Sequence, residues 1–269
     1  MRPPKLDPID VASLKNRLKT TPFAQGKIHY LPSTGSTNDV ARALAEKGAP
    51  EGTIVIAESQ TKGRGRLDRT WHSPPGTGLY FSIVLRPQLD PSDLPKITLL
   101  AGIAVAESIE ETTGLRPLIK WPNDLLLEGK KVAGILTELY GDITSPYVIL
   151  GIGINVHTRR EEFLPELQEI ATSLAMVGGQ NISRTRLLQA VLGHLGRWYE
   201  IFKKGVFQPI LDAWRKRCVI IGARVKILSG EKELEGTIVD VDVGGALLLR
   251  DQSGQIQRIL SGEVIRWKK

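Results

Sequence analysis

The stretch from residue 94 to residue 156 constrains the fold most, because one long helix is followed there by strands joined through short turns. Leu94–Thr113 carries apolar residues at helical spacing, and Gly114 ends the pattern. Glu128-Gly129-Lys130 is typical of a hairpin turn. The strand-like segments of this stretch are Pro117–Trp121, Leu125–Leu127, Lys131–Tyr140 and Tyr147–Val156.

Further elements are predicted on both sides of this stretch. Two segments rich in Ile, Val, Tyr and Phe read as strands, Thr53–Glu58 and Leu79–Leu85, and a loop heavy in Gly, Arg and Pro lies between them. Four more segments have the apolar spacing of helices, namely Pro8–Thr20, Thr37–Lys47, Ser183–Lys203 and Val206–Arg217.

The composition changes near Gly222. From there the chain has only short apolar runs separated by Gly, Asp and Ser, which are Arg224–Leu228, Glu235–Val241, Ala246–Arg250 and Ile256–Leu260. This spacing predicts a small β-barrel. We therefore expect a short helical segment over residues 1–27, a large domain over 28–220 and the barrel over 221–269.

Composition narrows the class of protein without naming a partner. No run approaches the ~18 apolar residues of a membrane helix, and the N-terminus lacks the apolar core of a secretory signal. The single cysteine, Cys218, excludes an intrachain disulfide and a cysteine-rich metal site. We expect a cytoplasmic protein that does not contact membranes. The net charge of +7 suits an anionic partner or a solvated basic surface equally well, since no block of like charges concentrates it.

The first motif is Gln60-Thr61-Lys62-Gly63-Arg64-Gly65-Arg66, in the loop after a strand. Its glycines let the backbone approach a ligand closely, and its arginines offer planar charged donors for carboxylate or phosphate. A nucleic-acid-binding RGG segment would look similar, although such segments usually repeat. A flexible loop with solvated arginines is the other alternative. The block favours anion binding.

The second motif joins Lys120-Trp121-Pro122-Asn123-Asp124 to a strand that begins with Lys131. The first part is a tight corner between strands. Because the strand after Lys131 is otherwise apolar, the ammonium of Lys131 could point into a pocket. Taken alone, the block is better explained by Lys130 and Lys131 blunting a hairpin.

The third motif is Gly151-Ile152-Gly153-Ile154-Asn155-Val156, at the end of a strand. Glycines inside a strand indicate the close approach of backbone or of a ligand. Asn155 offers a donor and an acceptor to an adenine edge. The chain has neither the dinucleotide-binding fingerprint nor a P-loop, so a nucleotide would have to be held in another way.

These three blocks, in this order and with Ser36-Thr37-Asn38 upstream, resemble the catalytic domain of biotin protein ligases. The resemblance covers about Ile28 to Arg217, and the C-terminal barrel resembles the SH3-like domain of bacterial members. It implies an α+β fold of the class II synthetase and biotin-lipoate ligase kind, with a mixed β-sheet flanked by helices. About 27 residues precede the catalytic domain, so we expect the monofunctional form without a DNA-binding domain.

The resemblance also implies a reaction. Biotin and ATP would form biotinyl-5′-AMP and pyrophosphate with Mg²⁺ accompanying ATP, and a lysine of a biotin carboxyl carrier protein or domain would then take the biotinyl group. Such a site must exclude water until the carrier arrives, and the glycine-rich loop and Thr158–Glu169 are the expected lids. The resemblance leaves open whether the protein is a monomer or a homodimer.

The site residues follow from the same resemblance. Those expected at biotin are Ser36, Thr37, Asn38, Gln60, Gly63, Arg64, Gly65, Arg66, Lys131 and Gly134. Those expected at ATP or the adenylate are Arg64, Arg66, Arg69, Trp71, Asn123, Lys131 and Asn155. Lys131, Arg64 and Arg66 are the expected catalytic groups, and Asp124 the expected ligand of Mg²⁺. Ser36-Thr37-Asn38 could alternatively, or in addition, cap the following helix.

One position departs from the family pattern, which commonly has glycine where this chain has Asp68. If that position needs a positive φ, aspartate tolerates it better than most residues. The alternatives are a lipoate or octanoate ligase, which would carry a different glycine-rich signature, a biotin-responsive DNA-binding repressor and an RNA-binding module. We expect no nucleic-acid partner. Arg224 and Arg266 are weak candidates for ligand contacts in the tail.

Overall fold

The computed structural model describes residues 7–88, 90–142, 145–179 and 182–268. Its larger sheet has seven strands in the order β1-β2-β3-β7-β6-β5-β4. Only β1 and β2 pair in parallel, so the sheet is mixed, as expected. The strands are β1 Ile28–Leu31, β2 Ile54–Ala57, β3 Gly78–Leu85, β4 Leu118–Lys120, β5 Asp124–Leu127, β6 Lys130–Tyr140 and β7 Tyr147–Asn155.

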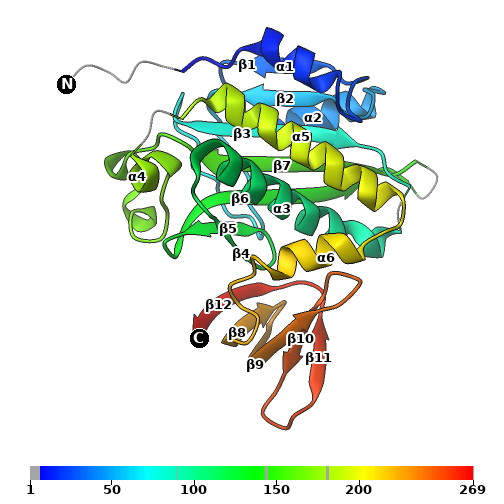
Figure 1. Ribbon diagram of the computed structural model, residues 1–269, viewed down its shortest axis with the longest axis vertical. Helices are drawn as coiled ribbons and strands as arrows, with labels where there is room; N and C mark the ends of the chain where they lie inside the picture. Colours follow the sequence, from blue (N-terminus) through cyan, green and yellow to red (C-terminus); the bar gives the residue numbers. More distant parts are fainter. Residues whose placement is uncertain (1–6, 89, 143–144, 180–181, 269) are drawn as a thin grey trace.

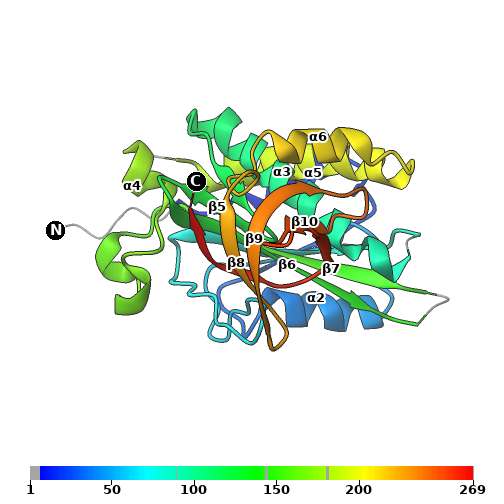
Figure 2. The same cartoon turned by 90° about the horizontal axis from the view of Figure 1, so that it is seen from below.

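Helices cover both faces of this sheet, and Figures 1 and 2 show α3, α5 and α6 on one face and α2 on the other. The helices are α1 Val11–Leu18, α2 Thr37–Glu46, α3 Leu94–Thr113, α4 Leu174–Gly178, α5 Arg184–Lys203 and α6 Gln208–Arg215. Short 3₁₀ turns lie at Pro91–Asp93, Arg160–Glu162 and Pro165–Leu167. The last two occupy the segment expected to act as a second lid.

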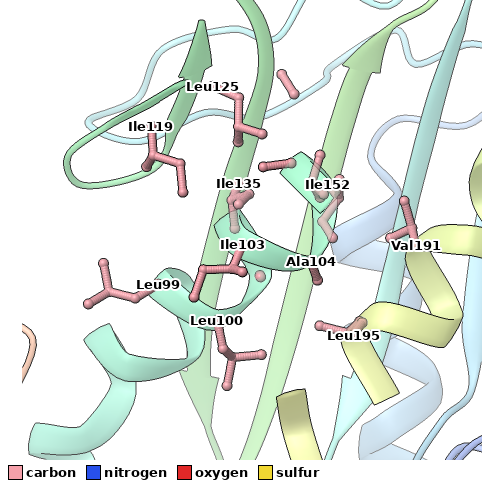
Figure 3. Packing of buried hydrophobic residues seen from close by; sticks show 14 of the residues in the cluster. Leu99, Leu100, Ile103, Ala104, Ile119, Leu125, Ile135, Ile152, Val191 and Leu195 are labelled. Atoms are coloured by element: carbon pink, nitrogen blue, oxygen red, sulfur yellow. The ribbon is translucent and has the colours of Figure 1, made fainter. Parts of the chain in front are cut away.

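The core lies between the sheet and α3 and α5. Leu100 and Ile103 of α3, Ile135 and Ile152 of the sheet and Leu195 of α5 are buried there (Figure 3). Helix α3 ends at Gly114, whose φ of 73° is the left-handed cap that glycine favours. Because apolar side chains fill this face, the α2 face is left to carry polar chemistry.

The C-terminal strands form a separate antiparallel sheet in the order β11-β10-β9-β8-β12, which is consistent with the expected SH3-like fold. The strands are β8 Arg224–Ser229, β9 Lys232–Val241, β10 Leu247–Arg250, β11 Ile256–Ile259 and β12 Glu263–Lys268. Arg215 of α6 donates to both carboxylate oxygens of Asp240 of β9, at 2.7 and 2.6 Å. The small sheet is therefore attached to the end of the larger domain.

Some boundaries differ from the expectations. Helix α6 is shorter than the predicted Val206–Arg217, and β1, β12 and α4 were not predicted. In the part of the chain that the structure describes, no helix combines the length and apolarity needed to cross a membrane.

Candidate active site

A cavity of about 700 Å³ lies on the α2 face of the large sheet and gathers residues from all three motifs. Gly63 is the one expected site residue outside its lining. The expected residues that line the cavity are Ser36, Thr37, Asn38, Gln60, Arg64, Gly65, Arg66, Arg69, Trp71, Asn123, Asp124, Lys131, Gly134 and Asn155. A side chain at Gly63 would overlap the carbonyl of Trp71, so this glycine lets the loop close on itself.

The polar end of the cavity is a hydrogen-bonded cluster at the start of α2. Gln60 accepts from the Thr37 amide at 2.8 Å and from the Thr37 hydroxyl at 3.1 Å. Ser82 Oγ lies 2.8 Å from Thr37 Oγ1 and 2.5 Å from Asn38 Oδ1. Ser36 occupies the N-cap position, but its side chain makes no cap hydrogen bond. Gln60 therefore satisfies a backbone N–H at the start of α2, and the Ser36 hydroxyl is not used as a cap.

Glycines form the floor under this cluster. A Cβ on Gly151 would overlap the Asn38 amide, and one on Gly153 would lie 2.5 Å from the Trp71 indole. A Cβ on Gly134 would lie 2.8 Å from the same ring. A close approach at residues 151 and 153 is present as expected, but the approaching groups are side chains of Asn38 and Trp71 and not backbone or a ligand.

Cations crowd the other end of the cavity. Arg66 has Asn123 Oδ1 at 3.4 Å, and burial lowers the pKa of Arg66. Burial also lowers the pKa of Lys120, which the sequence analysis did not assign to the site. Lys131 lies 2.6 Å from Asp124 Oδ1 and 5.3 Å from the centre of the Trp71 ring. Lowered pKa values mark cations that lose solvation without full compensation, so a bound anion would be stabilised here.

In all, five cations and three carboxylates line the cavity. The cations are Arg64, Arg66, Arg69, Lys120 and Lys131, and the carboxylates are Asp124, Glu169 and Glu263. The excess of positive charge favours an anionic ligand.

Arg64 faces away from this cationic end. Its guanidinium forms ion pairs with Asp39 of α2 and Glu138 of β6. Burial opposes the charged form, but the hydrogen bond to Tyr140 and the charges of Glu138 and Asp39 raise the pKa of Arg64 overall. In this structure Arg64 holds the loop against the protein.

The loop reaches a left-handed turn at its tip. Asp68 has φ of 56°, so the position with the departure from the family pattern does need a positive φ. Leu67, beside it, has φ of 53°, which costs a residue with a branched apolar side chain more. Next to the turn, Arg69 makes a bidentate pair with Glu263 of the C-terminal sheet, at 2.6 Å to each oxygen.

Asp124 is the carboxylate expected to bind Mg²⁺, and its surroundings offer little support for a metal. Its carboxylate is engaged by Lys131, and residues 7–268, outside the short undescribed gaps, hold no group of three His, Cys, Asp or Glu side chains suited to a metal. Mg²⁺ bound to a triphosphate needs only one or two protein carboxylates, however. The residues present therefore fit a magnesium ion that arrives with a nucleotide rather than a resident metal.

The C-terminal sheet contributes residues to the cavity that were not predicted from the sequence. Glu263, Val264 and Trp267 of β12 line the cavity, whereas Arg224 pairs with Glu235 and Arg266 is exposed. Nothing in the sequence around Glu263 marks it as a site residue. Lys120 could have been found, because it begins the motif that contains Asn123 and Asp124.

The chain is similar in sequence and fold to known proteins. Residues 30–155 match the family described as Biotin/lipoate A/B protein ligase family, and residues 220–267 match the Biotin protein ligase C terminal domain. The chain is 40% identical over 250 residues to the bifunctional ligase/repressor BirA of Bacillus spizizenii, covering 92% of this chain and 76% of that protein. It is 33% identical over 268 residues to the biotin--[acetyl-CoA-carboxylase] ligase of Mycobacterium tuberculosis, covering 96% of each. The structure of biotin protein ligase from Aquifex aeolicus in complex with biotin and ATP superposes with a TM-score of 0.79 at 35% identity, covering 90% of this chain and 99% of that one.

Proposed function

The chain belongs to the biotin protein ligase family, and we propose on that premise that it activates biotin with ATP and attaches it to a lysine of a biotin carboxyl carrier protein or domain. The observation that carries the proposal is the shared cavity. Arg66 of the glycine-rich loop and Lys131 of β6 come from separate parts of the chain and line the same space. Two anionic substrates that repel each other can meet there.

The charges explain how the first step becomes possible. The biotin carboxylate attacks the α-phosphorus of ATP, a new P–O bond forms, and pyrophosphate leaves with the electrons of the broken P–O bond. Arg66, Lys120 and Lys131 neutralise the carboxylate and phosphate oxygens and stabilise the charge that develops between them. Their partial burial strengthens each interaction relative to water.

The second step uses biotinyl-5′-AMP as the donor. The neutral amine of the carrier lysine attacks the acyl carbon, an amide forms, and AMP leaves as the acyl–phosphate bond breaks. Lys131 stays next to the phosphate and stabilises the departing charge. The amine must lose a proton in this step, and solvent at the cavity mouth can take it.

The polar cluster suits the ureido ring of biotin, which both donates and accepts hydrogen bonds. Thr37, Asn38 and Gln60 present hydroxyl and amide groups whose positions are set by contacts among themselves and with Ser82. A buried polar ligand is bound specifically only when each of its groups finds a partner. The glycines beneath have no side chains, so Thr37, Asn38 and Gln60 determine the shape of this end of the pocket.

Trp71 and Asn155 are the proposed contacts of the adenylate. Trp71 lines the cavity and can offer its indole ring to the adenosine, while its Nε1 is buried against Gly153 and has no hydrogen-bond partner among the described residues. Asn155 donates to the Thr172 carbonyl at 3.0 Å, which fixes its amide and leaves its carbonyl oxygen to accept. Asp124 would hold a magnesium ion that accompanies the triphosphate, and the ion would neutralise phosphate charge.

Two segments border the cavity and are proposed to exclude water. They are the glycine-rich loop and the segment with the two 3₁₀ turns, which contributes Phe163, Leu167 and Glu169 to the lining. Acyl-adenylates hydrolyse readily, so both segments would have to shield the intermediate. A cell compartment with ATP suits this chemistry, and we propose the cytoplasm.

The direct test is to incubate the purified protein with biotin, Mg·ATP and an apo-carrier domain and to weigh the carrier by mass spectrometry. We expect the carrier to gain the mass of one biotinyl group, and to gain nothing when lipoate replaces biotin. Lys131→Ala should abolish transfer while the protein stays folded. A carrier that gains lipoate but not biotin would refute the proposal.

A further inference from the structure

Glu138 touches two parts of the site at once without lining the cavity. Side chains alternate along β6, so Glu138 lies on the same face as Gly134 and Leu136, which do line it. Asn38, which does line the cavity, donates to Glu138, and the Glu138 side chain is 19% exposed. Glu138 can therefore act on a ligand only through its neighbours.

The first neighbour is Asn38 at the polar end of the pocket. Asn38 Nδ2 donates to Glu138 Oε2 at 2.7 Å, and Asn38 Oδ1 faces the Ser82 hydroxyl at 2.5 Å. Because a carboxylate only accepts hydrogen bonds, Glu138 decides which way the Asn38 amide points. Gly151 lets this amide settle against the sheet, where a larger residue would displace it.

The second neighbour is Arg64 in the glycine-rich loop, which pairs with the other oxygen, Glu138 Oε1. Arg64 also pairs with Asp39, but the Asp39 side chain is 53% exposed. An exposed ion pair contributes little, so the less exposed Glu138 is the stronger anchor of the loop.

We propose that Glu138 is a positioning residue that couples the polar end of the biotin pocket to the closed position of the glycine-rich loop. The proposal rests on the proposed function, since the pocket and the loop take their roles from it. One carboxylate fixes the donor that Asn38 offers to the ureido ring and holds Arg64, and with it the loop, over the cavity. Removing the charge should weaken biotin binding and release the intermediate together.

Glu138→Gln in the full chain tests this coupling, because it keeps the side-chain size and removes the charge. We expect the Kd for biotin, measured by isothermal titration, to rise about tenfold, equivalent to about 1.4 kcal/mol. We also expect free biotinyl-AMP to leave the enzyme several times faster in a turnover assay without carrier. A residue that only supported the fold would instead lower the unfolding temperature and the amount of active protein.

Three variants separate the two contacts. Asp39→Asn weakens the hold on Arg64 without touching Asn38, so it should speed adenylate release and leave the biotin Kd within about twofold of wild type. Ser82→Ala loosens Asn38 without touching Arg64, so it should weaken biotin binding and speed adenylate release less than Glu138→Gln does. Glu46→Gln removes an exposed pair with Arg42 elsewhere on α2 and should change neither quantity.

The proposal is overturned if Glu138→Gln, folded to wild-type thermal stability, behaves like Glu46→Gln in both assays, or changes only one of the two quantities. If Glu138→Gln does not fold, Glu138→Asp takes its place. It keeps the charge but shortens the reach, and the same paired effect is expected. A wild-type chain that binds biotin and forms no adenylate would refute the proposed function, while the biotin titrations would still test the link to Asn38.

Discussion

Three glycines in the central strands determine how closely side chains approach the sheet beneath the cavity. Gly151 accommodates Asn38, while Gly134 and Gly153 accommodate the Trp71 indole. Gly134 and Gly153 are direct neighbours across β6 and β7, so together they form one flat patch under the ring. The indole can lie this low only because both residues lack a side chain.

Gly153→Ala should therefore displace Trp71 and impair the site. The added Cβ would lie 2.5 Å from the indole, too close for contact, and the ring would have to move toward the cavity. We expect the KM for ATP to rise at least about tenfold and stability to fall by about 1–3 kcal/mol. Steady-state adenylate formation and urea unfolding measure the two effects. Unchanged kinetics would show that the ring does not contact the nucleotide.

Gly102→Ala is the matched control for that substitution. Gly102 lies in the middle of α3, and a Cβ there would meet its nearest atom at an ordinary 3.6 Å. Alanine should stabilise the helix by about 0.5–1 kcal/mol and leave the kinetics unchanged.

At single residues, the sequence predicted chemistry better than orientation. The cationic and glycine-rich motifs pointed to Arg66 and Lys131, and both line the cavity. The pairing of Arg64 with Asp39 and Glu138 could not be predicted, because these partners lie 25 and 74 residues away in the chain. Long-range packing decides which way a flexible charged side chain turns.

At the scale of elements, helix starts show how function and folding share residues. Ser183 caps α5 by accepting from the Arg186 amide, whereas Ser36 holds the same position at α2 without such a bond. Ser183→Ala should cost about 1 kcal/mol of stability. Ser36→Ala should cost less and weaken biotin binding instead. Equal losses of stability, seen in parallel denaturant titrations, would contradict this division of roles.

The contact between α3 and α5 should make stability depend on pH. His194 Nδ1 lies 3.1 Å from Glu107 and Nε2 lies 2.7 Å from Glu111, and the hydrogen bond to Glu107 is the main cause that raises the pKa of His194 above 6.5. Burial raises the pKa of Glu107, but hydrogen bonds from His194 and Trp198 and the charge of Arg197 bring it down to about 2.

The directions of the two pKa shifts define the pH range in which this contact stabilises the fold. The raised pKa of His194 stabilises the fold fully below pH 6.5, and this is lost as pH rises through the folded value. The lowered pKa of Glu107 stabilises it above pH 4.5, and this is lost as pH falls toward 2. His194→Gln should thus cost up to about 1 kcal/mol between these limits and less above them. A difference from wild type that stays constant from pH 5 to pH 9 in urea titrations would disprove the titration of His194.

Periodicity located the long elements and most of the short ones, but missed the short elements β1, β12 and α4. Helix α3 and strands β6 and β7 were predicted within a few residues because each buries a long apolar pattern. Strand β1 has four half-buried residues and no alternation, so its pairing with β2 decides its structure. Strand β12 likewise exists because it pairs with β8.

At the scale of the whole molecule, the C-terminal sheet forms part of the site, because residues of β12 line the cavity. Arg215 and Asp240 attach the sheet to α6, and this contact places β12 at the edge of the cavity. From there Glu263 reaches Arg69 of the glycine-rich loop. Composition alone predicted a separate barrel, but a docking contact between two domains leaves no periodic signal in either.

Glu263→Gln should therefore loosen the glycine-rich loop, although residue 263 lies far from the loop in the sequence. The bidentate pair fixes the orientation of the Arg69 guanidinium relative to the Glu263 carboxylate. The amide of Gln has only one oxygen, so it cannot accept from both nitrogens of Arg69. We expect biotinyl-AMP to escape several times faster, with an unfolding temperature close to that of wild type. Glu235→Gln is the control, since it removes an exposed pair with Arg224 on the same sheet and far from the loop in sequence. If both variants retain the intermediate equally, the C-terminal sheet lines the cavity but does not hold the loop closed. In that case Glu138 and Asp39 must hold the loop.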